Sequence, residues 1–389
     1  MQVDVLIRGD GAVGRSLALA LSHQGLRVGL LGRSQPRPHD VRAYALSAGA
    51  QALLARLKVW DGLPADAKTP VQDMQLAGDQ ENGRLNFSAW QSHLPDLAVI
   101  VDAAELDAAL DAALRYAPHV QRLETEVPHS LLALCEGREA QGLEVHGIQV
   151  ERRAYGHHAL AARWVSDTPH QGRAWQWFGA GAEIVALLPM DRPEPGHSYA
   201  LVWSQPEDEA QRRLALSPEA LAAELHTLTQ GRAGTLRAAG AAQAWPLSLL
   251  RATPMVRPGL ALLGDCAHQV HPLAGQGLNL GLADVAALAE VLSQREPWRP
   301  LGDLSLLRRY ERQRALDTWM MATVTDTLWH GFAHSAPWAR VARNQGLAMV
   351  DALSPLKRWL TQQALGASAQ SLAAPPSATP VTTSPRPLP

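Results

Sequence analysis

The sequence predicts an α/β fold made of a mostly parallel sheet domain, an inserted antiparallel β-sheet domain and helices toward the C-terminal end. Three observations support it. An apolar strand, a glycine-rich turn and a helix follow one another near residue 10, and residues 259–292 repeat the order strand, acid, glycine-rich loop, helix. Between these segments, residues 148–203 alternate apolar and polar side chains between Gly and Pro turns, as half-buried antiparallel strands do.

Length and composition narrow the class of protein. The 389 residues suffice for two joined domains with a large core, and the net charge of −2 gives no basic surface for nucleic acid. Two cysteines form no disulfide framework, so a reducing compartment is expected. The histidines lack partners at metal-ligand spacing, so we expect no metal. With no signal-peptide pattern and no apolar run of about 20 residues, we expect a cytoplasmic protein.

The first element is a strand at residues 3–7, followed at once by Gly9-Asp10-Gly11-Ala12-Val13-Gly14. A helix to residue 24 and a second strand at residues 26–31 complete a βαβ unit, the context in which GxGxxG indicates a Rossmann-like dinucleotide site. There the first glycine makes the tight turn, the second admits the pyrophosphate and the third allows close packing. We therefore expect the phosphate site to comprise Gly9, Gly11, Ala12, Val13 and Gly14.

The end of the second strand departs from this pattern. Dinucleotide-binding domains usually carry Asp or Glu there to bind the adenosine ribose, whereas this chain has Gly32-Arg33. A small residue followed by Arg is also found where a 2′-phosphorylated ribose binds. The first 34 residues alone would therefore fit NADP as well as FAD, and an NADP-dependent reductase stays open as an alternative.

The second motif begins with a buried strand at residues 260–263 that ends in Gly264-Asp265. Because ligands of open α/β sheets bind at the carboxyl ends of the strands, Asp265 is placed to accept hydrogen bonds from sugar or ribityl hydroxyls. Gly275 and Gly277 allow backbone N–H groups to approach a ligand closely, and the helix at residues 280–292 offers its positive end to phosphate.

This window closely resembles the second flavin-binding motif of the FAD-dependent aromatic hydroxylases, and most closely that of the ubiquinone-biosynthesis hydroxylases. The matching positions are Gly264, Asp265, Ala267, His268, Pro272, Gly275, Gln276, Gly277, Asn279, Gly281 and Asp284. The resemblance implies FAD as cofactor, held by Asp265, Pro272, Gly275, Gln276, Gly277, Leu278 and Asn279. Residues 40–46 resemble the family segment whose arginine, here Arg42, lies along the cofactor, and Arg33 is a further expected contact. His268 is expected to pack behind the site, and no catalytic residue is predicted.

Two departures from the family pattern lie in the middle of the chain. Only about 20 residues separate the helix near residue 110 from the strand at 131–135, where the family inserts several strands. The family's Asp-Gly fingerprint appears as Glu136-Gly137, without its Ser and Arg. Because that fingerprint touches flavin and nicotinamide, the electron donor, NAD(P)H or another, stays open. A scaffold protein in a quinone-biosynthesis complex, with weak or no FAD binding, is a second alternative.

The expected domains follow from these elements. Residues 1–145 and 245–300 form the FAD-binding domain, residues 146–244 with part of 71–95 form the β-rich substrate domain, and residues 301–366 form C-terminal helices. Residues 367–389, rich in Ala, Ser, Pro and Thr, are expected to be disordered. Among the aromatic residues of the substrate domain, Trp175, Trp177 and Phe178 are expected to pack in its core rather than border a quinoid ring.

The resemblance implies an FAD-dependent monooxygenase that hydroxylates an aromatic ring of a ubiquinone precursor. Its expected partners are a polyprenyl phenol, O₂ and a ubiquinone-biosynthesis protein complex. A polyprenyl substrate would also make peripheral contact with the inner face of the membrane useful.

Overall fold

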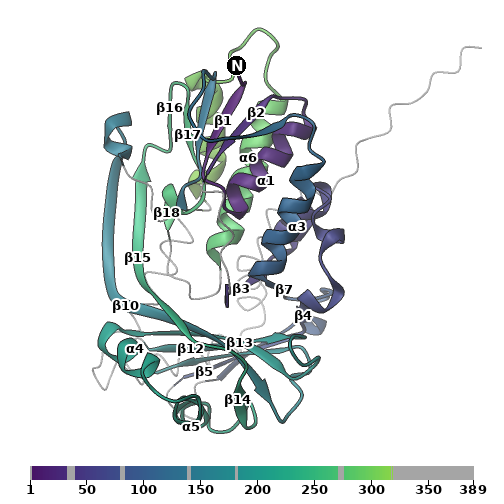
Figure 1. Ribbon diagram of the computed structural model, residues 1–389, viewed down its shortest axis with the longest axis vertical. Helices are drawn as coiled ribbons and strands as arrows, with labels where there is room; N and C mark the ends of the chain where they lie inside the picture. The colour runs from purple at the N-terminus through teal and green to yellow at the C-terminus, as the bar shows by residue number, and fades with distance from the viewer. Residues whose placement is uncertain are drawn as a thin grey trace, which may run out of the picture.

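The computed structural model describes residues 2–32, 40–78, 84–137, 142–179, 183–269, 276–316 and 318. These residues form a mostly parallel sheet, a large and mostly antiparallel sheet in which only β5 and β11 pair in parallel, and a small sheet of three strands. Figure 1 shows the parallel sheet and its helices at the top and the large sheet at the bottom, joined by the long strands β10 and β15. The predicted α/β fold class is confirmed.

The parallel sheet has the strand order β16-β17-β9-β1-β2-β8. All neighbouring strands run parallel except β16 and β17. Its central strands are buried, apart from Arg8 at the end of β1, because apolar side chains occupy both faces, as in other parallel sheets. The strands are β1 (Val5–Arg8), β2 (Val28–Leu31), β8 (Val120–Leu123), β9 (Leu131–Leu134), β16 (Val256–Arg257) and β17 (Leu260–Leu262).

Helices cover this sheet. The helix α1 (Ala12–His23) packs against both α3 (Ala103–Arg115) and α6 (Gln276–Ser293) (Figure 1). The helix α2 (Ala48–Arg56) packs against α6 as well. Ser47 caps α2 by accepting a hydrogen bond from the backbone N–H of Ala50. A last described helix, residues 304–316, buries Tyr310 completely against the sheet.

The large sheet has the order β18-β15-β10-β13-β12-β11-β5-β6, with β14 paired to β10. Its strands are β5 (Asp73–Ala77), β6 (Arg84–Ser88), β10 (Gln149–Ser166), β11 (Arg173–Phe178), β12 (Ile184–Met190), β13 (Ser198–Pro206), β14 (Leu236–Ala238), β15 (Gln243–Thr253) and β18 (His268–Gln269). The helices α4 (Glu207–Leu214) and α5 (Pro218–Thr229) lie beneath this sheet, on the face away from α1 and α6 (Figure 1). Ser217 caps α5 and Pro218 occupies its first turn, as expected.

The small sheet, β3-β7-β4, lies between the other two. Its strands are β3 (Ala43–Leu46), β4 (Lys68–Val71) and β7 (Ala98–Asp102). Ala45 and Ile100 share a buried cluster with Ala174 and Ala200 of the large sheet. Short 3₁₀ helices complete the described elements: η1 (Trp60–Gly62), η2 (Ala65–Ala67), η3 (Trp90–Ser92), η5 (Leu143–His146) and η7 (Gly264–Cys266). The domain boundaries near residues 145 and 245 stay predictions, because β10 and β15 run through both halves of the molecule.

Candidate functional site

The carboxyl ends of four parallel strands bring the sequence motifs to one edge of the sheet. The strand β1 lies between β2 and β9, so the strand order reverses there, and β17 follows β9. The chain leaves these strands at Gly9, Gly32, Cys135 and Gly264. In open α/β sheets, ligands bind in the crevice outside such a reversal.

The glycine-rich turn after β1 has the geometry of a phosphate site. Gly9 has φ +118°, and a Cβ there would lie 2.2 Å from the Cys135 carbonyl oxygen; a Cβ on Gly14 would lie 1.9 Å from the Gly9 carbonyl oxygen. At Gly11, in contrast, a Cβ would meet no described heavy atom within 4 Å. Gly11 is also the N-cap of α1, whose first turn carries no acid. The N–H groups at this helix start are therefore available to an anion, which fits a pyrophosphate.

The second motif packs directly on the first. A Cβ on Gly281 of α6 would lie 2.6 Å from Val13 Cγ2 of α1, and one on Gly264 would lie 3.3 Å from the same atom. Asp265 follows in η7, and a Cβ on Gly277 would lie 3.6 Å from its Oδ1. The carboxylate of Asp265 and the starts of α1 and α6 thus belong to one site. This set of a hydroxyl acceptor and two helix N-termini suits FAD.

A buried charge cluster holds the Gly264-Asp265 turn. Asp284 is completely buried; its Oδ2 accepts a hydrogen bond from the Gly264 N–H at 2.9 Å and lies 2.6 Å from Nε2 of His268. Its Oδ1 accepts a bond of 2.7 Å from Arg314 Nε. Burial alone would raise the pKa of Asp284, but His268 and Arg314 together lower it. Asp284 is therefore an anion, and His268 packs behind the turn as expected.

Asn279 fastens α6 to the segment that leads into α2. Its Oδ1 accepts a hydrogen bond from the Ser47 N–H at 3.0 Å, and its Nδ2 donates to the Ala45 carbonyl oxygen at 2.8 Å. Both bonds are buried. The expectation that Asn279 contacts the cofactor stays a prediction, as it does for its partly buried neighbour Leu278.

Arg42 is held in place by an ion pair with Asp40 at 2.5 Å and lies 5.7 Å from the ring of Tyr44. Asp107 of α3 is among the carboxylates that raise the pKa of Arg42 against the opposing effect of burial. Asp107 also lies 3.9 Å from Arg15 of α1. The backbone carbonyl oxygen of Arg42 accepts a hydrogen bond of 3.2 Å from the Ala103 N–H at the start of α3, so the Arg42 backbone lies beside that helix. The contact of its side chain with the cofactor stays a prediction.

Glu136 is fixed at the same edge by Arg8, whose Nη2 donates to Glu136 Oε1 at 2.8 Å. Glu136 stands where the family carries the Asp of its Asp-Gly fingerprint. Three further predicted contacts, Arg33, Pro272 and Gly275, lie outside the described residues, and only the backbone of Gln276 is described.

The aromatic residues of β11 divide between the two faces of the large sheet. Trp175 and Trp177 stack with centroids 5.5 Å apart and share a buried cluster with Leu221 and Leu225 of α5. They pack in the core away from the parallel sheet, as expected. Strand alternation places Phe178 on the opposite face of the sheet, where it is buried as well, as expected.

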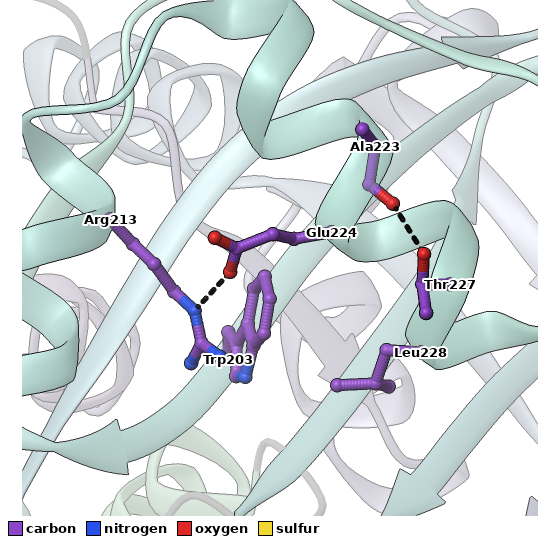
Figure 2. A pocket seen from close by; sticks show the side chains of 6 residues that line it. All are labelled: Trp203, Arg213, Ala223, Glu224, Thr227 and Leu228. Carbon is purple, nitrogen blue, oxygen red and sulfur yellow. Dashed lines mark hydrogen bonds and ion pairs between the residues drawn. The ribbon is translucent and has the colours of Figure 1, made fainter.

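A hollow on the α5 side of the sheet is separate from this site. Figure 2 shows its lining by Trp203, Arg213, Ala223, Glu224, Thr227 and Leu228. The guanidinium carbon of Arg213 lies 3.9 Å from the Trp203 ring centroid, and Glu224 pairs with Arg213 at 2.9 Å. Because Trp203 belongs to the cluster under α5, the hollow lies on the face opposite the glycine motifs.

The part of the chain that the structure describes contains neither a metal-ligand cluster nor a membrane-spanning helix. Within the ranges given above, no group of His, Cys, Asp and Glu is arranged to hold a metal ion. In that same part of the chain, no helix combines the length and apolar character needed to cross a membrane.

Comparisons with known proteins support a flavin site. A family model described as an FAD binding domain matches residues 124–325. The 3-demethoxyubiquinol 3-hydroxylase of Escherichia coli is 32% identical, over 93% of this chain and 98% of that protein. The ubiquinone hydroxylase UbiL of Rhodospirillum rubrum is also 32% identical, over 93% of this chain and 89% of its own length.

Solved structures share the fold. PqsL, a probable FAD-dependent monooxygenase of Pseudomonas aeruginosa, matches with a TM-score of 0.73 at 20% identity, covering 89% of this chain and 99% of its own. HpxO of Klebsiella pneumoniae, solved with FAD, matches with a TM-score of 0.72 at 18% identity, covering 93% and 98%. None of these comparisons supports the scaffold or the NADP-dependent reductase. The chain belongs to the FAD-dependent monooxygenases of the ubiquinone-hydroxylase family, as the motif resemblance predicted.

Proposed function

We propose that this protein uses O₂ to hydroxylate the aromatic ring of a polyprenyl phenol on the route to ubiquinone. The observation that carries the proposal is the contact between α1 and α6, which joins both flavin motifs at one sheet edge beside the large sheet. The names of the two 32%-identical relatives supply the substrate class. When bound, FAD supplies the oxygen activation and hydroxyl transfer.

The protein groups divide the task of holding the cofactor. The start of α1, from Gly11 to Gly14, would receive the pyrophosphate, and Asp265 would accept hydrogen bonds from ribityl hydroxyls. The start of α6 near Gly277 would place backbone N–H groups and the positive helix end beside the flavin ring. Asp284, through the Gly264 N–H, would keep Asp265 in position.

The face of the large sheet that is turned toward the parallel sheet would form one wall of the substrate site. In register across β11, β12 and β13 lie Gln176, Ala186 and Val202, and the next row holds Phe178, Ile184 and Ser204. The side chains of these two rows alternate with the buried Trp175, Trp177 and Trp203. A mostly apolar wall with few polar groups suits an aromatic ring and excludes water from the reaction.

We further propose peripheral contact with the inner face of the membrane, where a polyprenyl chain resides, and association with other ubiquinone-biosynthesis proteins. The membrane proposal rests on the polyprenyl chain of the substrate class. The C-terminal aromatic residues Trp329, Phe332, Trp338 and Trp359 lie outside the described residues. The electron donor stays open.

The direct test is oxygen uptake by the FAD-loaded protein with a reductant and a short-chain polyprenyl phenol. The proposal predicts uptake that depends on the phenol, and one labelled oxygen atom in the product when isotopically labelled O₂ is supplied. Replacement of the exposed Asp61 by Asn serves as a control with unchanged uptake. A flavin-loaded protein that leaves every phenol of this class unmodified would contradict the proposal.

A further inference from the structure

The adenosine end of the site lacks its usual acid, and the structure shows what stands there instead. In dinucleotide-binding folds, a carboxylate at the end of the second strand accepts hydrogen bonds from the ribose hydroxyls. Here β2 ends at Leu31, and Gly32 follows. A Cβ built on Gly32 would lie only 2.2 Å from the Cβ of Asp10, the residue between Gly9 and Gly11. The side chain of Asp10 thus starts where a side chain at position 32 would start.

We propose that Asp10 replaces the missing strand-end acid and accepts the hydrogen bond from the adenosine ribose of FAD. On this proposal, Gly32 is a glycine because the Asp10 side chain occupies its space, which the backbone N of Asp10, 2.9 Å from a Cβ at position 32, narrows further. The acid has moved from the end of β2 to the turn after β1, and it still reaches the same corner of the sheet. The proposal requires FAD as the cofactor, but it does not require the substrate proposed above.

Two arginines orient the carboxylate of Asp10. Its Oδ1 accepts a bond of 2.8 Å from Arg15 Nε, and its Oδ2 accepts one of 2.9 Å from Arg122 Nη1. A carboxylate offers about four acceptor positions, so both bonds leave capacity for a ribose hydroxyl. Arg15 is largely buried, whereas 47% of the Arg122 side chain is exposed, so Arg122 is the partner that can shift for a ligand.

The same carboxylate explains why Gly32-Arg33 does not indicate NADP. A 2′-phosphate on the ribose would place its negative charge against Asp10, and like charges at close range repel. A ribose hydroxyl, in contrast, can donate a hydrogen bond to that carboxylate. Asp10 would therefore select an unphosphorylated adenosine ribose.

The experiment measures the affinity of the apoprotein for FAD and for FAD analogues with 2′-deoxy- or 3′-deoxyadenosine, by quenching of flavin fluorescence. Because a hydrogen bond to a charged group is involved, removal of the bonded hydroxyl should weaken binding to the wild type by about 10- to 100-fold. In Asp10→Ala, FAD itself should bind more weakly, and the difference between FAD and the analogue should fall to about twofold or less, because the partner of the hydroxyl is gone. If the wild type binds FAD and both analogues equally, the proposal is overturned without any variant.

Asp111→Ala is the matched control. Asp111 pairs with Arg122 at 2.5 Å and with Arg15 at 3.6 Å, so its removal disturbs the same two arginines without touching Asp10. This variant should keep the full hydroxyl dependence, that is, the full difference in affinity between FAD and the deoxyadenosine analogue. If Asp10→Ala keeps it as well, Asp10 has only a structural role and the proposal fails.

A double variant tests whether an acid at position 32 can replace the acid at position 10. It also provides a test if Asp10→Ala does not fold. Asp10→Gly combined with Gly32→Glu returns the acid to the strand end and removes the nearest obstacle, the Cβ of Asp10. The backbone N and Cα of residue 10 would still lie 2.9 and 3.1 Å from the new Cβ, so the turn after β1 must shift slightly to admit it. The proposal predicts that this double variant binds FAD with a hydroxyl dependence like that of the wild type. A folded double variant without any hydroxyl dependence would overturn it. A wild-type protein that binds FAD but shows no phenol-dependent oxygen uptake would contradict the proposed function and would leave the proposal for Asp10 untouched.

Discussion

Asp284 shows how a single residue outside the cofactor contacts can govern the site. Asp284 and His268 could be identified from the sequence, because both fall at positions that match the family pattern. Arg314 was missed, since it lies thirty residues along the chain from Asp284 and only the fold brings its Nε within 2.7 Å of the carboxylate. The one signal in the sequence was an arginine four residues after Tyr310, on the same face of a helix.

Replacement of Asp284 by Asn should destabilise the protein strongly. Arg314 would lose the anion that compensates its buried charge, and the loss of one partner of a buried pair typically costs about 3–5 kcal/mol. Urea unfolding of the apoprotein measures the change. Glu290→Gln on the same helix is the control, and we expect it to shift the free energy of unfolding by about 0.5 kcal/mol or less. Equal stability of the two variants would show that the buried cluster is not needed.

At the scale of elements, the candidate FAD site depends on the close approach of α1 and α6. The sequence placed Gly281 in the motif but could not give the reason for a glycine there. That reason is the Val13 side chain of α1, which occupies the space of the missing Cβ. Such contacts between distant segments do not appear in local sequence patterns.

Gly281→Ala should therefore weaken FAD binding by about tenfold or more, because the extra methyl group forces α6 away from α1. Flavin fluorescence titration of the apoprotein measures the affinity. Val13→Ala in the same chain should restore much of it by removing the clashing Cγ2 atom. Gly62→Ala is the control, since a Cβ there meets no described atom within 4 Å. A Gly281→Ala variant with normal affinity would show that the helices have room to spare.

The pair of helices under the large sheet gives a pH prediction. Glu224 of α5 binds Arg212 and Arg213 of α4, and the hydrogen bond from Arg212 is the main cause that lowers the pKa of Glu224 to about 2. Because the folded pKa is below the ordinary value of 4.5, this contribution to stability is present above pH 4.5 and is lost as the pH falls toward 2.

Glu224→Gln should thus lower the melting temperature at pH 7, and the difference from the wild type should shrink steadily as the pH falls from 4.5 toward 2. Thermal unfolding followed by circular dichroism measures it. Glu144→Gln, at an exposed position, should show no such pH-dependent difference. A difference that stays constant down to the lowest pH would mean that the ion pairs of Glu224 do not contribute.

At the scale of the whole molecule, local patterns were enough for much of the fold. The strand-turn-helix order around Gly9 and Asp265 predicted the parallel sheet, and alternation in residues 148–203 predicted the large antiparallel sheet. The sequence assigned part of residues 71–95 to the β-rich domain, but it could not show that β5 pairs in parallel with β11, because this pairing connects segments about 100 residues apart. It also could not show that Asp10 lies against Gly32, since the two residues end different strands.

The central claim is that the two glycine motifs form one FAD site, and the absorption spectrum of the purified protein tests it most directly. The account predicts the bands of oxidised flavin in the wild type and in the Asp61→Asn control, and their loss in Asp265→Ala. A folded wild-type protein that stays colourless after incubation with FAD would contradict the claim.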